Sequence, residues 1–224
     1  VSATENLPGR PPNLSAGCSH RAVYYALRKT FGDDAFYSSD IGCYTLGMLP
    51  PLRMADFLVC MGSSVSAGSG FAMAADKPVV AFIGDSTFFH SGMTGLANAV
   101  FNRHDLLIIV LDNGTTAMTG HQPNPGMLQD VLGESAVHLD IESVVRGLGV
   151  TEVTKVKAYN LRNLLKALED MKKNAAQKAT EETRKITHLE DIKNVMEAFH
   201  VSAEQAMKAL KIPESESSRF LSML

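Results

Sequence analysis

The residues with the clearest chemical potential are Asp85 and Asn113, which each follow a short apolar run. The first run covers residues 78–83 and the second covers residues 106–111, and both are rich in β-branched side chains. Such runs are typical of buried parallel strands, whose carboxyl ends open on a ligand crevice. A helix-length segment separates them, so a strand–helix–strand crossover would bring the carboxylate and the amide close together. Mg²⁺ prefers such oxygen ligands, together with water and phosphate oxygens.

The segment Gly84-Asp85-Ser86-Thr87-Phe88, followed by Asp112-Asn113, resembles the diphosphate-binding signature of thiamine-diphosphate enzymes. That signature is usually written GDG followed by NN, so Ser86 and Asp112 depart from it. Further motifs make the chain similar to the cofactor-binding domain of the large subunit of indolepyruvate ferredoxin oxidoreductase, from about residue 7 to about residue 156. These motifs are Leu7–Pro12, Ala16–Arg21, Ser39–Gly47, Met61–Ser64 and Gly84–Gly92.

The resemblance implies that Asp85 and Asn113 bind Mg²⁺ through their side chains and Thr115 through its backbone carbonyl. The metal would bridge the two phosphates of thiamine diphosphate. A diphosphate that leaves water needs cations or backbone N–H groups to offset its charge. We expect a helix from about residue 92 whose first N–H groups contact phosphate. An isolated aspartate before a helix is more often a cap, but the second strand ending at Asn113 favours a site.

The resemblance also implies that the loop containing His20 approaches the thiazolium and the substrate. His20 would bind the substrate carboxylate or handle protons. From the residues alone, this loop is equally well a polar turn with Ser19 as the cap of the following helix. Likewise, Asp40-Ile41-Gly42-Cys43 could be a simple turn, and Met61–Ser64 could serve close packing of a helix on the sheet. The implied cofactor-binding set is Gly17, Cys18, Ser19, Asp40, Gly42, Cys43, Gly62, Ser63, Gly84, Asp85, Ser86, Thr87, Asn113 and Thr115.

A dinucleotide-binding protein of the NAD type is a competing interpretation. The segment 57–70 contains an apolar run, several glycines and a helical pattern, and the next apolar run ends at the acidic residue Asp85. This is the outline of a dinucleotide-binding unit. However, Gly68-Ser69-Gly70 comes too late after the apolar run to form the tight first turn. We therefore rank thiamine diphosphate above NAD as the expected cofactor.

The composition is that of an ordinary globular protein. The chain has 224 residues, of which 45% are hydrophobic and 20% charged. A net charge of −3 gives no reason to expect nucleic-acid binding, and no apolar run is long enough to cross a membrane. The cysteines at positions 18, 43 and 60 are widely spaced, which suits the reducing cytoplasm. Three cysteines cannot supply a four-cysteine iron–sulfur cluster.

Strand and helix patterns alternate along most of the chain. This alternation predicts an α/β fold with a doubly wound, mostly parallel sheet. The loop after Asn113, rich in glycine and proline, is long enough that we expect it to cover the diphosphate or the substrate. Strands are expected over 35–39, 56–60, 79–83, 106–111 and 152–156, and helices over 22–29, 64–75, 92–102, 141–148 and 161–174.

The character of the chain changes after residue 177. Residues 178–187 are strongly charged, and apolar residues then recur at helical spacing. Ser202–Gln205 reads as a capping box, and Ile212-Pro213 precedes a further short helix. We therefore expect a thiamine-diphosphate-binding domain over 1–177, a charged linker over 178–187 and a helical tail over 188–224.

The resemblance implies a component of an enzyme that oxidatively decarboxylates 2-oxoacids of the arylpyruvate type. The cofactor supplies that chemistry, but its activation needs a glutamate from a pyrimidine-binding domain or partner subunit, and this sequence offers no candidate. We expect the chain to be inactive alone and to depend on such a partner or on an oligomer. The other implied partners are an iron–sulfur subunit or domain, ferredoxin and coenzyme A. A non-catalytic descendant that acts in assembly or regulation is the alternative.

Overall fold

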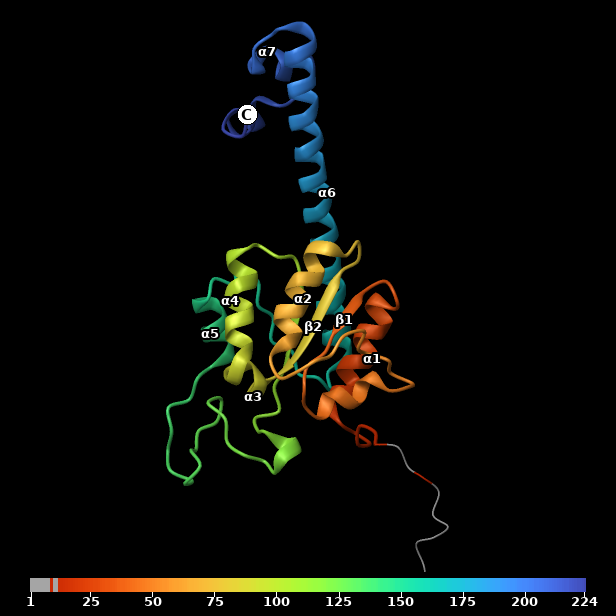
Figure 1. Ribbon diagram of the computed structural model, residues 1–224, viewed down its shortest axis with the longest axis vertical. Helices are drawn as coiled ribbons and strands as arrows, with labels where there is room; N and C mark the ends of the chain where they lie inside the picture. The colour runs from red at the N-terminus through yellow and green to blue at the C-terminus, as the bar shows by residue number, and fades with distance from the viewer. Residues whose placement is uncertain (1–8, 10–11) are drawn as a thin grey trace, which may run out of the picture. The chain divides into compact units, whose positions relative to one another are not determined.

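A computed structural model of the protein describes residue 9 and residues 12–224. Most of the predicted motif Leu7–Pro12 therefore lies outside the described residues. The chain divides into two compact units, one ending at Leu168 and the other covering Glu169–Leu224. Figure 1 shows the sheet and its helices in the first unit.

The first unit is built on a parallel sheet of three strands in the order β1-β2-β3. These strands are β1 (Phe36–Ser38), β2 (Val79–Gly84) and β3 (Leu107–Leu111). Every residue of β2 is buried, which explains its continuous apolar pattern. The β2–β3 register pairs Gly84 with Leu111. The two strands therefore end side by side, as their sequence patterns predicted.

Helices cover both faces of this sheet (Figure 1). Side chains alternate along β2, so Val80 and Phe82 join one apolar cluster while Ile83 joins another. The first cluster includes α1 (Ser19–Phe31) and the first turns of α6 (Leu161–Phe199). The second includes α2 (Ser63–Ala74), α4 (Met93–Phe101) and α5 (Ile141–Gly147). This arrangement confirms the doubly wound α/β fold.

The structure differs from the predicted elements at two strands. Within residues 56–60, only Phe57 forms a bridge, with Ser38 of β1. Residues 152–156 contain no strand. Val153 and Val156 nevertheless pack against opposite apolar clusters, as residues on opposite faces of a strand would. The apolar alternation at this segment therefore reflects packing rather than a ladder of backbone hydrogen bonds.

Short helical turns complete the first unit. They are the 3₁₀ turns η1 (Cys43–Met48) and η3 (Ala117–Thr119), the single turn α3 (Asp85–Thr87) and the π-helical turn η2 (Phe88–Gly92). The last of these joins α3 to α4 without interruption.

The second unit is entirely helical, and the continuation of α6, α7 (Ala203–Ala209) and α8 (Glu214–Leu221) supplies its helices. The predicted capping box is confirmed, since Ser202 and Gln205 exchange side-chain-to-backbone hydrogen bonds. The charged segment 178–187, predicted to be a linker, lies within α6. No helix among the described residues is both long and apolar enough to cross a membrane. The core of the second unit contains Ile192, Ala206, Met207, Ile212 and Phe220.

Candidate functional site

Asp85 begins a helical segment at the carboxyl end of β2, and its side chain is only 3% exposed. The helix was expected to begin near residue 92, and this expectation is wrong because α3, η2 and α4 follow one another from Asp85 to Phe101. Gly84 is the N-cap residue, and no side chain caps this end of the helix. The simple capping role considered for Asp85 is therefore not what the structure shows. A π-helical turn directly after the first turn is a feature that often accompanies functional sites.

The side chains of Asp85 and Asn113 meet at the ends of β2 and β3. One terminal atom of the Asn113 amide lies 3.2 Å from Asp85 Oδ1 and 2.7 Å from the Thr115 carbonyl oxygen. With the amide nitrogen at this position, Asn113 donates hydrogen bonds to both oxygens. With the amide oxygen there, three oxygens converge. Neighbouring oxygens of an octahedral Mg²⁺ site, with bonds of about 2.0–2.1 Å, lie about 2.9 Å apart, and the two distances from the Asn113 atom, 3.2 and 2.7 Å, lie on either side of that spacing.

This set contains a single carboxylate. Among the described residues, no group of three or more His, Cys, Asp or Glu side chains is placed to hold a metal ion. A cation at Asp85 would therefore rely on neutral protein oxygens, on water and on ligand phosphates, which is the usual pattern for Mg²⁺.

Asn124 is a second polar partner of Asp85, and sequence reasoning did not single it out. Its side-chain nitrogen donates to Asp85 Oδ2 at 3.1 Å, and its own oxygen accepts a hydrogen bond from Gly126 N at 2.9 Å. Asn124 is only 8% exposed although it lies in the long loop after Asn113. The only sequence signal was an amide flanked by two prolines in a loop expected to cover the site.

Burial shifts the pKa values of Asp85 and His20 in opposite directions. It raises the pKa of the Asp85 carboxyl, hydrogen bonds from the Ser86 N–H and Asn124 oppose the shift, and the charge of Asp112 adds to it. Burial also lowers the pKa of His20 below its usual value of 6.5, an effect that the negative charge of Asp85 partly opposes. A bound cation would favour the ionised form of Asp85.

Tyr44 is another residue that sequence reasoning missed. Its hydroxyl accepts a hydrogen bond from Gly84 N at 2.9 Å and donates one to the Ile41 carbonyl at 3.1 Å. A Cβ atom at Gly84 would lie 2.9 Å from the Tyr44 ring, and one at Gly42 would lie closer still. The His20 ring meets the Tyr44 ring edge-on at 5.9 Å. Tyr44 therefore joins the turn after β1, the end of β2 and His20.

Asp40 has its carboxylate engaged by the backbone. Its two oxygens accept hydrogen bonds from Ile41 N and Gly62 N at 2.8 Å and from Ser64 N at 2.9 Å. Gly62, with a φ of +83°, is the N-cap residue of α2, and Ser63 begins that helix. These residues hold the start of α2 beside the turn after β1. Their contact with a cofactor stays a prediction.

The other predicted residues surround this arrangement. Cys18 is the N-cap residue of α1, so the assignment of Ser19 as the cap is wrong. The Gly17 carbonyl accepts a hydrogen bond from the Tyr159 hydroxyl at 2.7 Å, and Cys43 begins η1. Two further contacts join the segment after Gly84 to neighbouring loops: Ser86 Oγ accepts a hydrogen bond from Thr116 Oγ1 at 2.7 Å, and Thr87 Oγ1 donates one to the Ile41 carbonyl at 3.4 Å.

The dinucleotide alternative loses its main feature in the structure. Gly68 and Gly70 lie within α2 rather than in the turn between a strand and a helix. They therefore cannot form the tight phosphate-binding turn that such proteins use.

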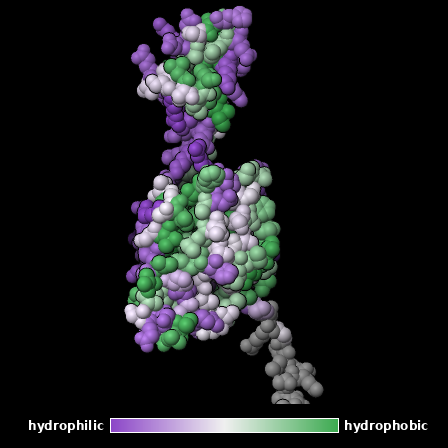
Figure 2. All heavy atoms as spheres, turned by 60° about the vertical axis from the view of Figure 1, so that its left-hand side comes forward, coloured by the Kyte–Doolittle hydropathy of each residue, from purple (hydrophilic) through white to green (hydrophobic). Residues whose placement is uncertain are grey.

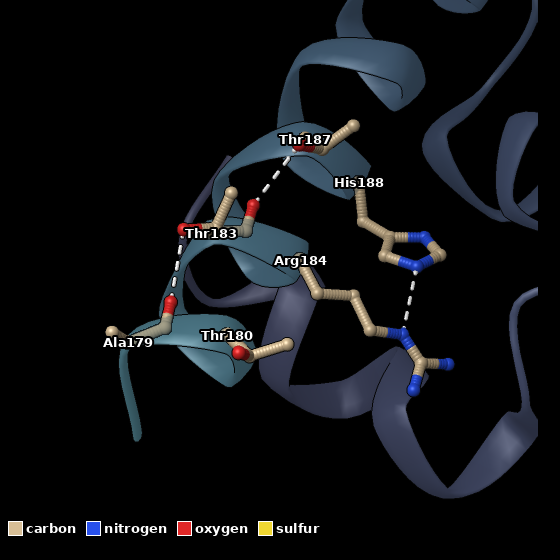
Figure 3. A pocket seen from close by; sticks show the side chains of 6 residues that line it. All are labelled: Ala179, Thr180, Thr183, Arg184, Thr187 and His188. Carbon is tan, nitrogen blue, oxygen red and sulfur yellow. Dashed lines mark hydrogen bonds between the residues drawn. The ribbon is translucent and has the colours of Figure 1, made fainter. Parts of the chain in front are cut away.

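Two cavities open along α6, with volumes of about 490 and 580 Å³. Figure 3 shows the first, where Arg184 Nε donates to His188 Nε2 at 3.3 Å and the Thr183 and Thr187 hydroxyls donate to backbone carbonyls one turn earlier. Both cavities belong to the second unit, and no predicted site residue lines them. Ala179, Thr180, Thr183, Arg184, Thr187 and His188 line the first cavity.

Comparisons with known proteins identify the family of this domain. Residues 40–180 match the family described as thiamine pyrophosphate enzyme, C-terminal TPP binding domain. Indolepyruvate oxidoreductase subunit IorA of Methanothermobacter thermautotrophicus is 48% identical over 163 residues, covering 70% of this chain and 26% of the relative. The same subunit of Thermococcus kodakarensis is 45% identical over 181 residues, covering 73% and 28%. The chain thus spans about a quarter of the length of these curated relatives.

A solved structure shares the fold. It is a 2-oxoglutarate:ferredoxin oxidoreductase from Magnetococcus marinus, with a TM-score of 0.61 and 16% identity over 75% of this chain and 64% of that one. The family match covers more than half of the present chain and includes the strand ends that carry Asp85 and Asn113. The protein therefore belongs to the thiamine pyrophosphate enzymes, of which it carries the C-terminal TPP-binding domain.

Proposed function

We propose that this chain is the thiamine-diphosphate- and Mg²⁺-binding component of a 2-oxoacid ferredoxin oxidoreductase of the indolepyruvate type. The observation that carries the proposal is that one terminal atom of the Asn113 amide lies 3.2 Å from Asp85 Oδ1 and 2.7 Å from the Thr115 carbonyl oxygen, in a domain of the thiamine pyrophosphate family. The names of the curated relatives support the indolepyruvate type.

In this proposal, Asp85, Asn113 and Thr115 hold Mg²⁺ and so offset the charge of the diphosphate. Ser86 and Thr87 lie in the first helical turn after β2, where backbone N–H groups have no partner within the helix. They are proposed to donate to phosphate oxygens. When bound, thiamine diphosphate supplies the nucleophilic carbon and the electron sink for decarboxylation.

His20 is proposed to hold the substrate. It is 6% exposed, and its lowered pKa keeps the imidazole neutral near pH 7. A neutral imidazole offers one N–H donor and one acceptor nitrogen, so His20 can donate to a substrate carboxylate oxygen without adding a charge. The Tyr44 ring packs edge-on against the His20 ring, and Gly42 and Cys43, which lie next to Tyr44 in the chain, are proposed to contact the cofactor.

The chain needs partners to act. The curated relatives are about four times longer than the matched region, and the chain itself is proposed to bind only the diphosphate half of the cofactor. The proposed further parts are a pyrimidine-binding domain or subunit that supplies a glutamate, and an iron–sulfur unit that passes electrons to ferredoxin, with coenzyme A accepting the acyl group. The assembly is proposed to be oligomeric and cytoplasmic.

Reconstitution tests this proposal. The chain would be combined with its partner polypeptides, thiamine diphosphate, Mg²⁺ and coenzyme A, and viologen reduction would be followed with indolepyruvate, phenylpyruvate and pyruvate. We expect reduction that requires this chain and is fastest with an arylpyruvate. Cofactor binding without turnover of any 2-oxoacid would instead favour the non-catalytic descendant.

A further inference from the structure

The long loop that supplies Asn124 continues into a hairpin over residues 127–139, here called the apolar hairpin. Its two sides are joined by a bridge between Gln129 and Ser135 and by a hydrogen bond from Ala136 N to the Leu128 carbonyl at 2.9 Å. At the tip, Asp130 Oδ1 accepts hydrogen bonds from Leu132 N at 2.8 Å and from Glu134 N at 3.0 Å. The hairpin therefore has a defined backbone conformation.

This ordered hairpin exposes large aliphatic side chains. Leu128 is 70% exposed, Val131 82%, Leu132 81% and Val137 84%. Figure 2 shows apolar side chains at the surface of the unit that contains the sheet. Single exposed apolar residues are common in soluble proteins, whereas these four lie within one short structured element, and apolar surface of this kind is typical of interaction sites.

The base of the apolar hairpin is joined to the candidate cofactor site. Met127 N donates to the Asn124 carbonyl at 2.9 Å, and Leu139 N donates to the Pro125 carbonyl at 2.9 Å. Both ends of the hairpin are thus hydrogen-bonded to the neighbouring residues Asn124 and Pro125. The side chain of Asn124 in turn donates to Asp85. Immobilising the hairpin would therefore also hold the Asn124 amide against the Asp85 carboxylate.

We propose that the apolar hairpin docks into an aliphatic groove on the polypeptide that completes the cofactor site, and that docking fixes Asn124 on Asp85. This inference rests on the proposed function. The lengths of the relatives support this occupant, since about three quarters of each lies outside the match and is available as further polypeptide. The bonds that join the hairpin to Asn124 at the cofactor site also support it. The exposed Glu134 carboxylate at the tip calls for a basic residue at the rim of the groove.

The test uses the full chain and, as the partner probe, the part of the Methanothermobacter thermautotrophicus relative outside the matched residues. Association would be measured by analytical ultracentrifugation with thiamine diphosphate and Mg²⁺ present. The double variant Val131→Gln/Leu132→Gln should bind the probe about tenfold or more weakly. The control Met73→Gln/Phe101→Gln changes two apolar residues of similar exposure, 73% and 84%, in the last turns of α2 and α4. It should bind like the unchanged chain.

Three results would overturn the docking proposal: no association of the unchanged chain, equal loss of affinity in both double variants, or a self-associated chain that the hairpin variant dissociates. Calorimetry on the chain alone separates this failure from failure of the proposed function. Mg²⁺-dependent cofactor binding that is the same in the unchanged chain and the hairpin variant is expected. If the unchanged chain binds no cofactor, the proposed function fails. If it binds cofactor but the hairpin changes leave association intact, only the docking proposal fails.

Discussion

At the scale of single residues, the feature that most needs explanation is a buried carboxylate with amide and backbone N–H partners. Asp85 is 3% exposed, and burial raises its pKa. A raised acid pKa means that the folded state binds the proton more tightly, so this group makes folding less favourable as the pH rises above the usual value of 3.8. Such a cost persists at functional sites where a ligand offsets it.

We therefore predict that Asp85→Asn raises the melting temperature of the metal-free protein at pH 7 while abolishing the response to Mg²⁺ and thiamine diphosphate. The neutral amide removes the cost of burying a charge and also removes the anionic ligand. Thermal denaturation in EDTA and with added cofactor measures both effects. A variant that still gains stability from Mg²⁺ and cofactor would exclude Asp85 as the metal ligand.

His20 predicts a pH dependence of the opposite sign. Its folded pKa lies below the usual 6.5 because of burial, so the unfolded chain binds the proton more tightly. The stability that His20 contributes is present above pH 6.5 and is lost as the pH falls through that value toward the folded pKa. Urea denaturation between pH 5 and pH 8 should show a smaller loss on acidification for His20→Gln. Identical profiles would assign the pH dependence to other groups.

Residues that end strands could be predicted from the sequence, whereas their more distant partners could not. Asp85 and Asn113 each follow an apolar run, and parallel pairing alone brings them together. Asn124 reaches Asp85 from a loop without regular secondary structure. Tyr44 meets Gly84 across forty positions of the chain. No local pattern encodes either contact, because each depends on the folded path of a turn or loop.

Among the elements of the fold, the turn after β1 is joined to the end of β2 by one aromatic side chain, that of Tyr44. Tyr44 packs against Gly42 and Gly84 so closely that neither position has room for a Cβ atom. The predicted helix start near residue 92 is wrong because Ser86 and Thr87, which were expected to precede the helix, continue the helical backbone from Asp85. The strand predicted over residues 152–156 is absent, because an apolar pattern indicates burial and not backbone hydrogen bonding.

This packing predicts opposite effects for two glycine substitutions. Gly84→Ala should destabilise the fold by about 1–3 kcal/mol, because the new methyl group meets the Tyr44 ring. Gly70→Ala should stabilise it by about 0.5–1 kcal/mol, since that position lies within α2 with nothing within 4 Å of a new Cβ. Urea denaturation of both variants measures these changes. An equal response at the two positions would contradict the role given to Tyr44.

At the scale of the whole molecule, α6 belongs to both units. Leu164 and Leu168 complete an apolar cluster of the first unit, while Ile192 lies in the core of the second. The charged segment that begins at residue 178 interrupts the sheet pattern, and the sequence therefore predicts a boundary at residue 177. The two compact units of the structure separate between Leu168 and Glu169, inside a continuous helix, while independent folding of a domain that ends at residue 177 stays a prediction. A helix that leaves one core and enters another keeps its backbone bonds, so composition alone does not mark the division.

We predict that a chain ending at residue 177 remains folded and binds thiamine diphosphate with Mg²⁺. It retains every residue of the two apolar clusters around the sheet, including Leu164 and Leu168. The matched control ends at residue 160, which removes both leucines and exposes the face they cover. Gel filtration should show a monodisperse protein for the first truncation and aggregation for the second. Aggregation of the chain ending at 177 would show that the first unit requires the second.

The central claim is that this chain holds the diphosphate of thiamine diphosphate through a cation bound by Asp85 and Asn113. Isothermal titration calorimetry of the full chain with thiamine diphosphate, with and without Mg²⁺, tests it most directly. We predict binding that requires Mg²⁺, is abolished in Asp85→Ala and is weakened less in Asn113→Ala, because removing a neutral ligand sacrifices less charge compensation. Binding of equal affinity without Mg²⁺, or unchanged affinity in Asp85→Ala, would exclude this cation site.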